Sequence, residues 1–404
     1  MSIFHRNPLH RSTVVWIVSG LLGAHGAALA DDGGGGPAIA LLATVPTPGA
    51  PLVVFDISWV DPDTQTYYLA DRSNAAIDVV DARRNRFVRQ IHAGFKGFTG
   101  NNDTSGPNGV TVSGHWLFAS DAGSRIVSID LRSDAVADVA FTGGAPGLRA
   151  DELAYDPSDG VLLVVNNADS PPFATMIQVN QQTGHLTVAR RIVFSTASNG
   201  AEQPVWDPGT RRFYISIPEI GGSVADGAVG RINLDGTLER LFPVRTCQPA
   251  GLALGPDHDL LLGCSVIFDT AGQPWSPTDP LSAAPTQVVM DARTGAIDAS
   301  VAGVGGSDEI WFNPGDRRYY TASRGNPSGA ALGVIDAHRQ SLVQVVPTFN
   351  TPATVPAPRG TSHSLAANPH DNHVFLPLPA NNVFPSCLNG CIGVFGTPGR
   401  DDDD

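Results

Sequence analysis

The chain of 404 residues is poor in charged side chains and lacks the motifs of several common enzyme classes. It contains no Gly-x-Ser-x-Gly nucleophile motif, no phosphate loop and no His-Glu-x-x-His motif. The sequence therefore offers no support for a serine hydrolase, a nucleotide-binding enzyme or a zinc protease. Basic residues are also few, because 25 Lys and Arg stand against 39 Asp and Glu. We expect no nucleic acid partner, since phosphate binding requires a basic surface.

Long apolar runs are absent except near the N-terminus. A short basic region with Arg6 and Arg11 precedes an apolar stretch from Thr13 to Leu29, which ends in Ala-Leu-Ala at residues 28–30. This order is typical of a secretory signal peptide, so we predict that residues 1–30 are removed and that no membrane span remains. The mature protein is then expected in a bacterial periplasm or secreted, with a flexible stub at 31–37 and an acidic, disordered tail at 398–404.

A repeated strand pattern, rich in Gly and Pro, dominates the rest of the chain. Each copy has a short apolar run, a turn and a second apolar run, and in six of the seven copies a polar residue opens the first run. The copies are DISWVDP at Asp56, PNGVTVS around Asn108, DELAYDP at Asp151, EQPVWDP at Glu202, AGLALGP around Ala250, DEIWFNP at Asp308 and HSLAANP at His363. Sevenfold repetition predicts one all-β domain over residues 38–397, a seven-bladed β-propeller with four-stranded blades.

The two ends of the repeat array indicate how the propeller closes. The last copy ends near Gly396 with its third strand and has no room for a fourth. An unassigned apolar segment, AIALLATV, precedes the first copy at residues 38–45. We predict that this N-terminal strand completes the last blade, because a free sheet edge invites aggregation.

Four cysteines suit an oxidising compartment. Cys247 and Cys264 fall at the same end of two successive predicted strands, and Cys387 and Cys391 flank a short Leu-Asn-Gly loop. We predict disulfides 247/264 and 387/391. Metal ligation by these thiols is the weaker alternative, because no two of them form a Cys-x-x-Cys pair.

The polar residues that open the copies are expected to form a ring. The first strand of every blade lines the channel of a propeller, so residues at one repeat position converge near one channel mouth. Oxygen ligands suit a hard divalent cation, and we predict a metal site with Ca²⁺ as the first candidate. Its expected ligands are Asp56, Asn108, Asp151, Glu202 and Asp308.

These opening residues also have a structural interpretation. Polar side chains at a channel mouth often cap strand ends or hold water, because buried polar groups need partners. We expect His363, taken alone, to be a hydrogen-bonded channel residue. Trp59, Trp206 and Trp311 recur near the ends of first strands and are most simply explained by packing between blades.

Two further sets of residues are expected at the same mouth. Arg72 and Arg324 follow second strands, which end on that face. The loops at 93–106 and 265–286 are candidate walls or lids of a substrate site, although each is equally explained as a merely long loop.

Two segments resemble a known enzyme family. AEQPVWDPGTRRFYISIPE, from Ala201 to Glu219, resembles the Glu-Gly-Pro-x-Trp opening of the senescence marker protein 30 and gluconolactonase family, and GPNGVTVSGHWLFASDAGSRI resembles its Pro-Asn-Gly segment. The resemblance implies metal ligation by Glu202 and Asn108 in a propeller that hydrolyses lactones. It also implies an Asp that is both ligand and base, a role open to Asp151 or Asp308.

The expected function is therefore metal-dependent opening of a lactone or related ester bound at the channel mouth. An Asp would activate water, and Arg72 or Arg324 would stabilise the developing charge. Two alternatives stay open. IDVVDARRNRFVRQI resembles the YVTN-type repeats of exported propellers, which implies a non-catalytic module for a ligand or a protein partner. The seven-bladed streptogramin B lyase, which uses a metal and a His, is similar in architecture and would give His363 a catalytic role.

Overall fold

The computed structural model describes residues 38–274, 276, 285–348, 362–380, 382 and 384–399. The predicted signal peptide, the stub, most of the acidic tail and part of the loop at 265–286 lie outside these residues. Within them the regular structure consists of 28 strands and three short 3-10 turns, η1 (Asn102–Thr104), η2 (Pro256–His258) and η3 (Pro385–Cys387). No helix of the described residues is long and apolar enough to cross a membrane. The all-β prediction is confirmed.

Four sheets each contain four antiparallel strands that follow one another along the chain. The first two are formed by β2 (Ser58–Asp61), β3 (Thr66–Asp71), β4 (Ala76–Asp81) and β5 (Arg86–Ile91), and by β6 (Val110–Ser113), β7 (Trp116–Asp121), β8 (Arg125–Asp130) and β9 (Ala135–Phe141). The other two are formed by β10 (Leu153–Asp156), β11 (Val161–Asn166), β12 (Phe173–Val179) and β13 (Leu186–Val193), and by β22 (Ile310–Asn313), β23 (Arg318–Ser323), β24 (Ala331–Asp336) and β25 (Ser341–Pro347).

An eight-stranded sheet lies in the sequence between the sheet that ends with β13 and the sheet that begins with β22. Its strands are β14 (Pro204–Asp207), β15 (Arg212–Ile217), β16 (Asp226–Ile232), β17 (Leu238–Arg245), β18 (Cys247–Leu254), β19 (Asp259–Ile267), β20 (Thr286–Asp291) and β21 (Ile297–Ala302). The runs β14–β17 and β18–β21 are each antiparallel, and one parallel pair, Asp226 with Cys247, joins them. The sheet thus consists of two four-stranded units.

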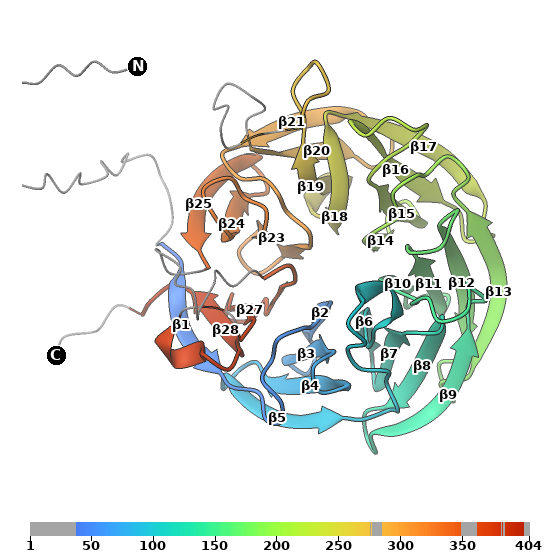
Figure 1. The fold of residues 1–404 in the computed structure, drawn as a ribbon, viewed down its shortest axis with the longest axis vertical. Helices are drawn as coiled ribbons and strands as arrows, with labels where there is room; N and C mark the ends of the chain where they lie inside the picture. The colour runs from blue at the N-terminus through green and yellow to red at the C-terminus, as the bar shows by residue number, and fades with distance from the viewer. Residues whose placement is uncertain are drawn as a thin grey trace, which may run out of the picture. The chain divides into compact units, whose positions relative to one another are not determined.

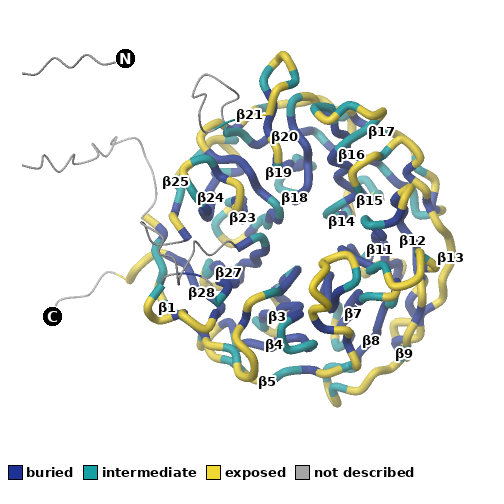
Figure 2. Tube along the Cα trace, in the orientation of Figure 1, coloured by how far each residue is buried: buried dark blue, intermediate teal, exposed yellow. Residues whose placement is uncertain are grey.

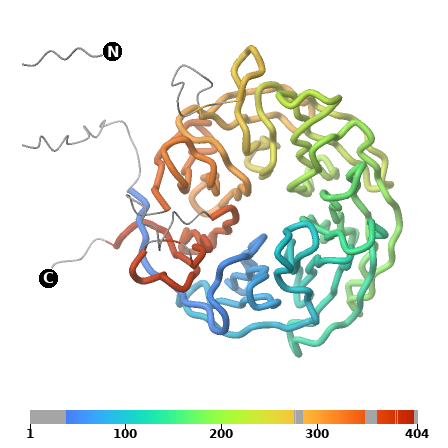
Figure 3. The backbone as a smooth tube through the Cα atoms, in the orientation of Figure 1, coloured from blue at the N-terminus to red at the C-terminus, as the bar shows by residue number. Residues whose placement is uncertain are grey.

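The remaining sheet joins the two ends of the repeat array. It contains β26 (Ala366–Ala367), β27 (Val374–Leu378), β28 (Cys391–Gly396) and, as its outer strand, β1 (Ala40–Val45). β1 runs antiparallel to β28, with Val45 opposite Ile392, and the blue segment of β1 lies beside the red segments of the last sheet in Figure 3. This pairing confirms the prediction for the N-terminal strand.

The hairpin turns explain many of the acidic residues. A carboxylate at a strand end accepts a hydrogen bond from the backbone N–H two residues later, which fixes a tight turn. Seven Asp residues do this: Asp61, Asp81, Asp130, Asp156, Asp207, Asp291 and Asp336. Because these carboxylates are used in turns, the acidic composition owes much to the architecture of the repeats.

The sheets follow chain order around a common centre, and the first strand of each sheet lies toward that centre (Figure 1). The outer strands are the most exposed, as the colours of Figure 2 show. Neighbouring sheets pack through apolar faces; Tyr68 and Val79, for example, share a cluster with Val112 and Leu117 of the next sheet. This is a propeller-like arrangement, in which residues that open successive repeats meet near one axis.

Both predicted disulfides are confirmed. Cys247 and Cys264 join β18 to β19 with Cα atoms 5.1 Å apart, and Cys387 and Cys391 close the loop before β28 with Cα atoms 5.4 Å apart. Disulfides persist in oxidising compartments, so two such bonds are consistent with an extracellular or periplasmic protein.

Candidate functional site

The backbone holds five of the opening residues in one common way. Each lies two residues before the first strand of its repeat, and its N–H donates to a carbonyl of the second strand at 2.7 to 3.1 Å. The acceptors are Ala70, Ser120, Val165, Ser216 and Ala322 for Asp56, Asn108, Asp151, Glu202 and Asp308, respectively. Equivalent backbone bonds in successive repeats are what bring these side chains toward one mouth.

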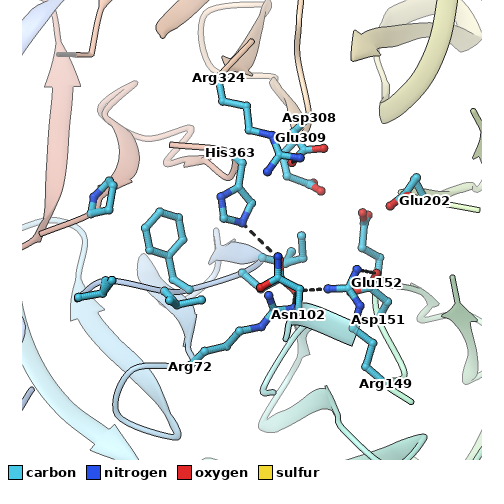
Figure 4. A pocket seen from close by; sticks show the side chains of 16 residues that line it. Arg72, Asn102, Arg149, Asp151, Glu152, Glu202, Asp308, Glu309, Arg324 and His363 are labelled. Carbon is cyan, nitrogen blue, oxygen red and sulfur yellow. Dashed lines mark hydrogen bonds and ion pairs between the residues drawn. The ribbon is translucent and has the colours of Figure 1, made fainter. Parts of the chain in front are cut away.

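A cavity of about 350 Å³ lies where these residues meet (Figure 4). Of the residues predicted for the site, all but Asn108 line it; they are Asp56, Arg72, Asp151, Glu202, Asp308, Arg324 and His363. Six carboxyl groups and three guanidinium groups line it in all, so negative charge is in excess when every group is ionised.

Arg72 forms the most buried ion pair of the site. Its side chain is only 2% exposed and contacts Asp56, while Nε and Nη2 donate to Oδ1 of Asn108 at 3.0 and 2.6 Å. The Nδ2 group of Asn108 donates to the Ala150 carbonyl at 2.6 Å. Burial alone would raise the pKa of Asp56, but Arg72, together with His363 and Arg149, lowers this pKa well below its usual range. Asn108 therefore acts here as a support for Arg72.

Arg149, which the sequence analysis did not select, links two carboxylates. Its Nη2 lies 2.9 Å from Asp151, its Nη1 lies 3.6 Å from Asp56, and its Nε donates to Asn167 at 3.2 Å. Burial raises the pKa of Asp151 to about 6, although Arg149 opposes the rise. Asp151 is thus poised to exchange a proton near neutral pH.

The opposite wall carries carboxyl groups without a guanidinium partner among the described residues. Burial, with the nearby charges of Asp151 and Asp308, raises the pKa of Glu202 to about 8. Burial also raises the pKa values of Glu152 and Glu309 well above their usual range, and the nearby charges of Glu309 and Asp308, respectively, add to the rise. With a pKa of about 8, Glu202 is largely protonated at neutral pH.

Two predicted residues complete the rim. Arg324 is half exposed and pairs with Asp308 at 2.9 Å. His363 stacks on Phe55 with ring centroids 4.9 Å apart, and its Nε2 lies 3.3 Å from Asp56. His363 is a hydrogen-bonded channel residue in this structure.

The predicted calcium ligands do not fit a cation in their present arrangement. Asp56, Asn108 and Asp151 all face arginine, so a cation there would meet two guanidinium charges. Among the described residues, no three His, Cys, Asp or Glu side chains are placed to hold one ion together. Calcium binding stays a prediction.

Four polar residues of the cavity were not predicted from the sequence. Glu152 and Glu309 follow opening residues in the doublets of DELAYDP and DEIWFNP, and this shared doublet was the available signal. Asn102 lines the cavity from the loop at 93–106, which agrees with the prediction of a wall there. Arg149 lies before the third repeat at a position that no other repeat shares, so periodicity could not reveal it.

Comparisons with known proteins support the fold only. No family model matches the chain, and no curated protein matches it. A solved structure of hydrazine synthase from Kuenenia stuttgartiensis is similar, with a TM-score of 0.62 and 13% sequence identity over 83% of this chain and 94% of that chain. At this identity the likeness is one of architecture, and function must be argued from the site.

The site combines three chemical capacities. Arg72, Arg149 and Arg324 can bind or stabilise negative charge, Asp151 can accept a proton, and protonated Glu202 can donate one. Carboxyl groups in one cavity with pKa values pushed apart are a common arrangement for acid and base catalysis.

Proposed function

We propose that this protein is an exported, seven-bladed β-propeller hydrolase that opens a lactone or related ester. The blade count is supported by five four-stranded sheets together with an eight-stranded sheet that divides into two units at a single parallel pair. The two disulfides support export.

The observation that carries the catalytic proposal is the pairing of Asp151 and Glu202 across a cavity that also holds three arginines. Asp151 forms an ion pair with Arg149 at 2.9 Å, which favours its ionised form, whereas Glu202 forms no ion pair among the described residues and feels Arg149 only from a greater distance. One carboxyl is therefore available as a base and the other as an acid at the same pH.

The proposed reaction uses both groups. A water oxygen attacks the substrate carbonyl carbon, and Asp151 takes a proton from that water. Arg324, exposed at the rim, stabilises the charge that develops on the carbonyl oxygen. The ring carbon–oxygen bond then breaks, and Glu202 gives its proton to the leaving oxygen, which yields a hydroxy acid. Proton exchange with solvent restores both carboxyl groups.

Turnover of a panel of lactones and alkyl esters tests this proposal. Asp151→Asn and Glu202→Gln should each lower kcat/KM by about 100-fold or more, because a positioned general acid or base contributes on that order. Glu239→Gln is the matched control, since Glu239 pairs with Arg212 and Arg231 on an outer strand away from the cavity. If the wild type turns over no member of the panel, the catalytic proposal fails.

Two other functions have specific support. The buried network of Arg72, Asp56 and Asn108 holds one wall of the cavity rigid, which suits a non-catalytic module that binds a ligand, or a side chain of a protein partner, in that cavity. The pair of His363 and Asp56 at 3.3 Å suits a base for elimination, as in a lyase. Reaction in ¹⁸O-labelled water separates the two reactions, because hydrolysis places the label in the product and elimination does not.

A further inference from the structure

A second cavity, of about 290 Å³, adjoins the polar cavity. Ile57, Glu152 and Glu309 line both, so the two spaces meet at these side chains. We call the second space the apolar section. It lies among the first strands of the sheets, whereas the polar cavity lies among the residues that precede those strands.

Aromatic and aliphatic side chains make up most of the wall of the apolar section. Its aromatic members are Trp59, Tyr155, Trp206, Trp311 and Phe312, which come from β2, β10, β14 and β22. Their recurrence in the sequence predicts packing between blades for the three tryptophans. The structure shows that they also face an internal space.

Contacts with other aromatic rings hold three of these side chains in place. Trp59 meets Trp311 edge to face, with centroids 5.0 Å apart, and Trp206 lies 4.7 Å from Phe213. Such contacts fix the rings at the wall and keep them from filling the space. The apolar section is therefore preformed, as binding cavities for small molecules usually are.

Glu152 and Glu309 stand at the boundary between the two sections. They are 6% and 5% exposed and are hydrogen-bonded to each other. No other hydrogen bond of their carboxyl groups is found in the part of the chain that the structure describes. Each carboxyl thus keeps unused acceptor or donor capacity toward a molecule that passes between the sections.

We propose that the apolar section binds an alkyl chain of the substrate, so that the substrate is an amphipathic lactone or ester. The polar head lies among Asp151, Glu202 and Arg324, and the chain passes Glu152 and Glu309 toward the tryptophans. This inference rests on the proposed function for the identity of the head group. Burial of an alkyl chain against aromatic and aliphatic walls is favourable because it removes apolar surface from water.

The volume of the apolar section limits the length of the alkyl chain that it can bind. A volume of 290 Å³ has room for about ten groups the size of a water molecule. Affinity should therefore rise about fourfold for each added methylene, as expected for complete burial of that group, and then stop rising once the section is full.

The test uses γ-butyrolactone and γ-lactones with alkyl side chains of two to twelve carbons, together with the matching γ-lactams, which resist hydrolysis. Binding of the lactams is measured by calorimetry and by the fluorescence of the tryptophans, and turnover is measured for the lactones. We expect lactam affinity and lactone kcat/KM to rise with chain length and then to level off.

A substitution that fills the apolar section tests whether the alkyl chain binds there. Val205 lies in β14 and lines the apolar section, so Val205→Trp should remove the dependence of lactam affinity and of lactone kcat/KM on alkyl-chain length. Val188→Trp, at a 46% exposed position of the outer strand β13, is the matched control and should behave as the wild type. If Val205→Trp does not fold, the chain-length series on the wild type still decides the matter.

The outcomes separate this inference from the proposed function. Turnover that is independent of chain length, with equal affinity for all lactams, would overturn the inference and leave the hydrolase standing. Lactam binding that rises with chain length and depends on Val205, without any turnover, would support the apolar section and overturn the hydrolase.

Discussion

Arg72 donates two hydrogen bonds to one atom of Asn108, its Oδ1, from Nε at 3.0 Å and from Nη2 at 2.6 Å. The same guanidinium contacts Asp56, so one buried cation joins the residues that open two successive repeats. Arg72 therefore has a structural role in addition to any contact with a ligand.

Replacement of Arg72 by Met should destabilise the fold strongly. The change leaves Asp56 buried with only the more distant Arg149 and His363 as partners, and removal of one member of a buried ion pair costs about 3–5 kcal/mol. The free energy of unfolding from urea titration measures this cost. Arg84→Met is the control, because Arg84 is 63% exposed in its pair with Asp81 and should contribute less than about 1 kcal/mol. A cost for Arg72→Met as small as that of the control would contradict the buried pair.

Calcium should have little effect on the stability of the protein. Because arginines contact four of the five predicted ligands, we expect a chelator to leave the melting temperature unchanged. A cation at 100 times its Kd would instead stabilise the fold by about 2.7 kcal/mol. Metal analysis of the purified protein and melting with and without chelator measure the effect. Bound calcium that is lost in Glu202→Gln would establish the site predicted from the sequence.

Hydrolysis should depend on pH with two limbs. The reaction needs ionised Asp151, so kcat/KM should rise as pH increases through about 6, and it needs protonated Glu202, so kcat/KM should fall as pH increases through about 8. The maximum is expected between these values. In Glu202→Gln the alkaline limb should disappear along with most of the activity. A profile that keeps its alkaline limb in this variant would assign the acid to another group.

The two disulfides should contribute unequally to stability. Cys247 and Cys264 are separated by 17 residues and Cys387 and Cys391 by 4. On the chain-entropy model the first bond is worth about 3 kcal/mol and the second about 2 kcal/mol, since the longer loop loses more freedom when it is closed. Denaturation of the paired Cys→Ala variants measures both. An equal or reversed order would show that effects other than loop closure dominate.

Most of the fold could be predicted from the sequence because each repeat carries its own strand and turn signals. The second apolar run of the first copy, TYYLAD, coincides with β3 (Thr66–Asp71), and the predicted N-terminal strand contains β1 (Ala40–Val45). A short apolar run bounded by Asp-rich turns predicts a strand from a few neighbouring residues alone. The sevenfold repetition of such runs then predicts the propeller.

The site could be predicted from the sequence only for residues at equivalent positions of the repeats. Asp56, Asp151, Glu202 and Asp308 share a backbone environment, so their convergence could be foreseen. The partners of these carboxylates could not be foreseen, because Arg149 reaches Asp56 from the loop between β9 and β10, at a separation in sequence that no local pattern encodes. Such contacts determine which carboxylates are neutralised by an arginine. They therefore also determine whether the site favours a metal ion or proton transfer.

The pairing of β1 with β28 also determines when the fold can be completed. Val45 is made early during synthesis and must wait for Ile392, its partner, before its strand has a neighbour. Loop closure over so long a separation is slow, and it cannot begin until the ribosome has reached the final repeat. The last sheet therefore assembles after translation of its C-terminal strand, and until then the nascent chain exposes an unpaired strand at each end of the array.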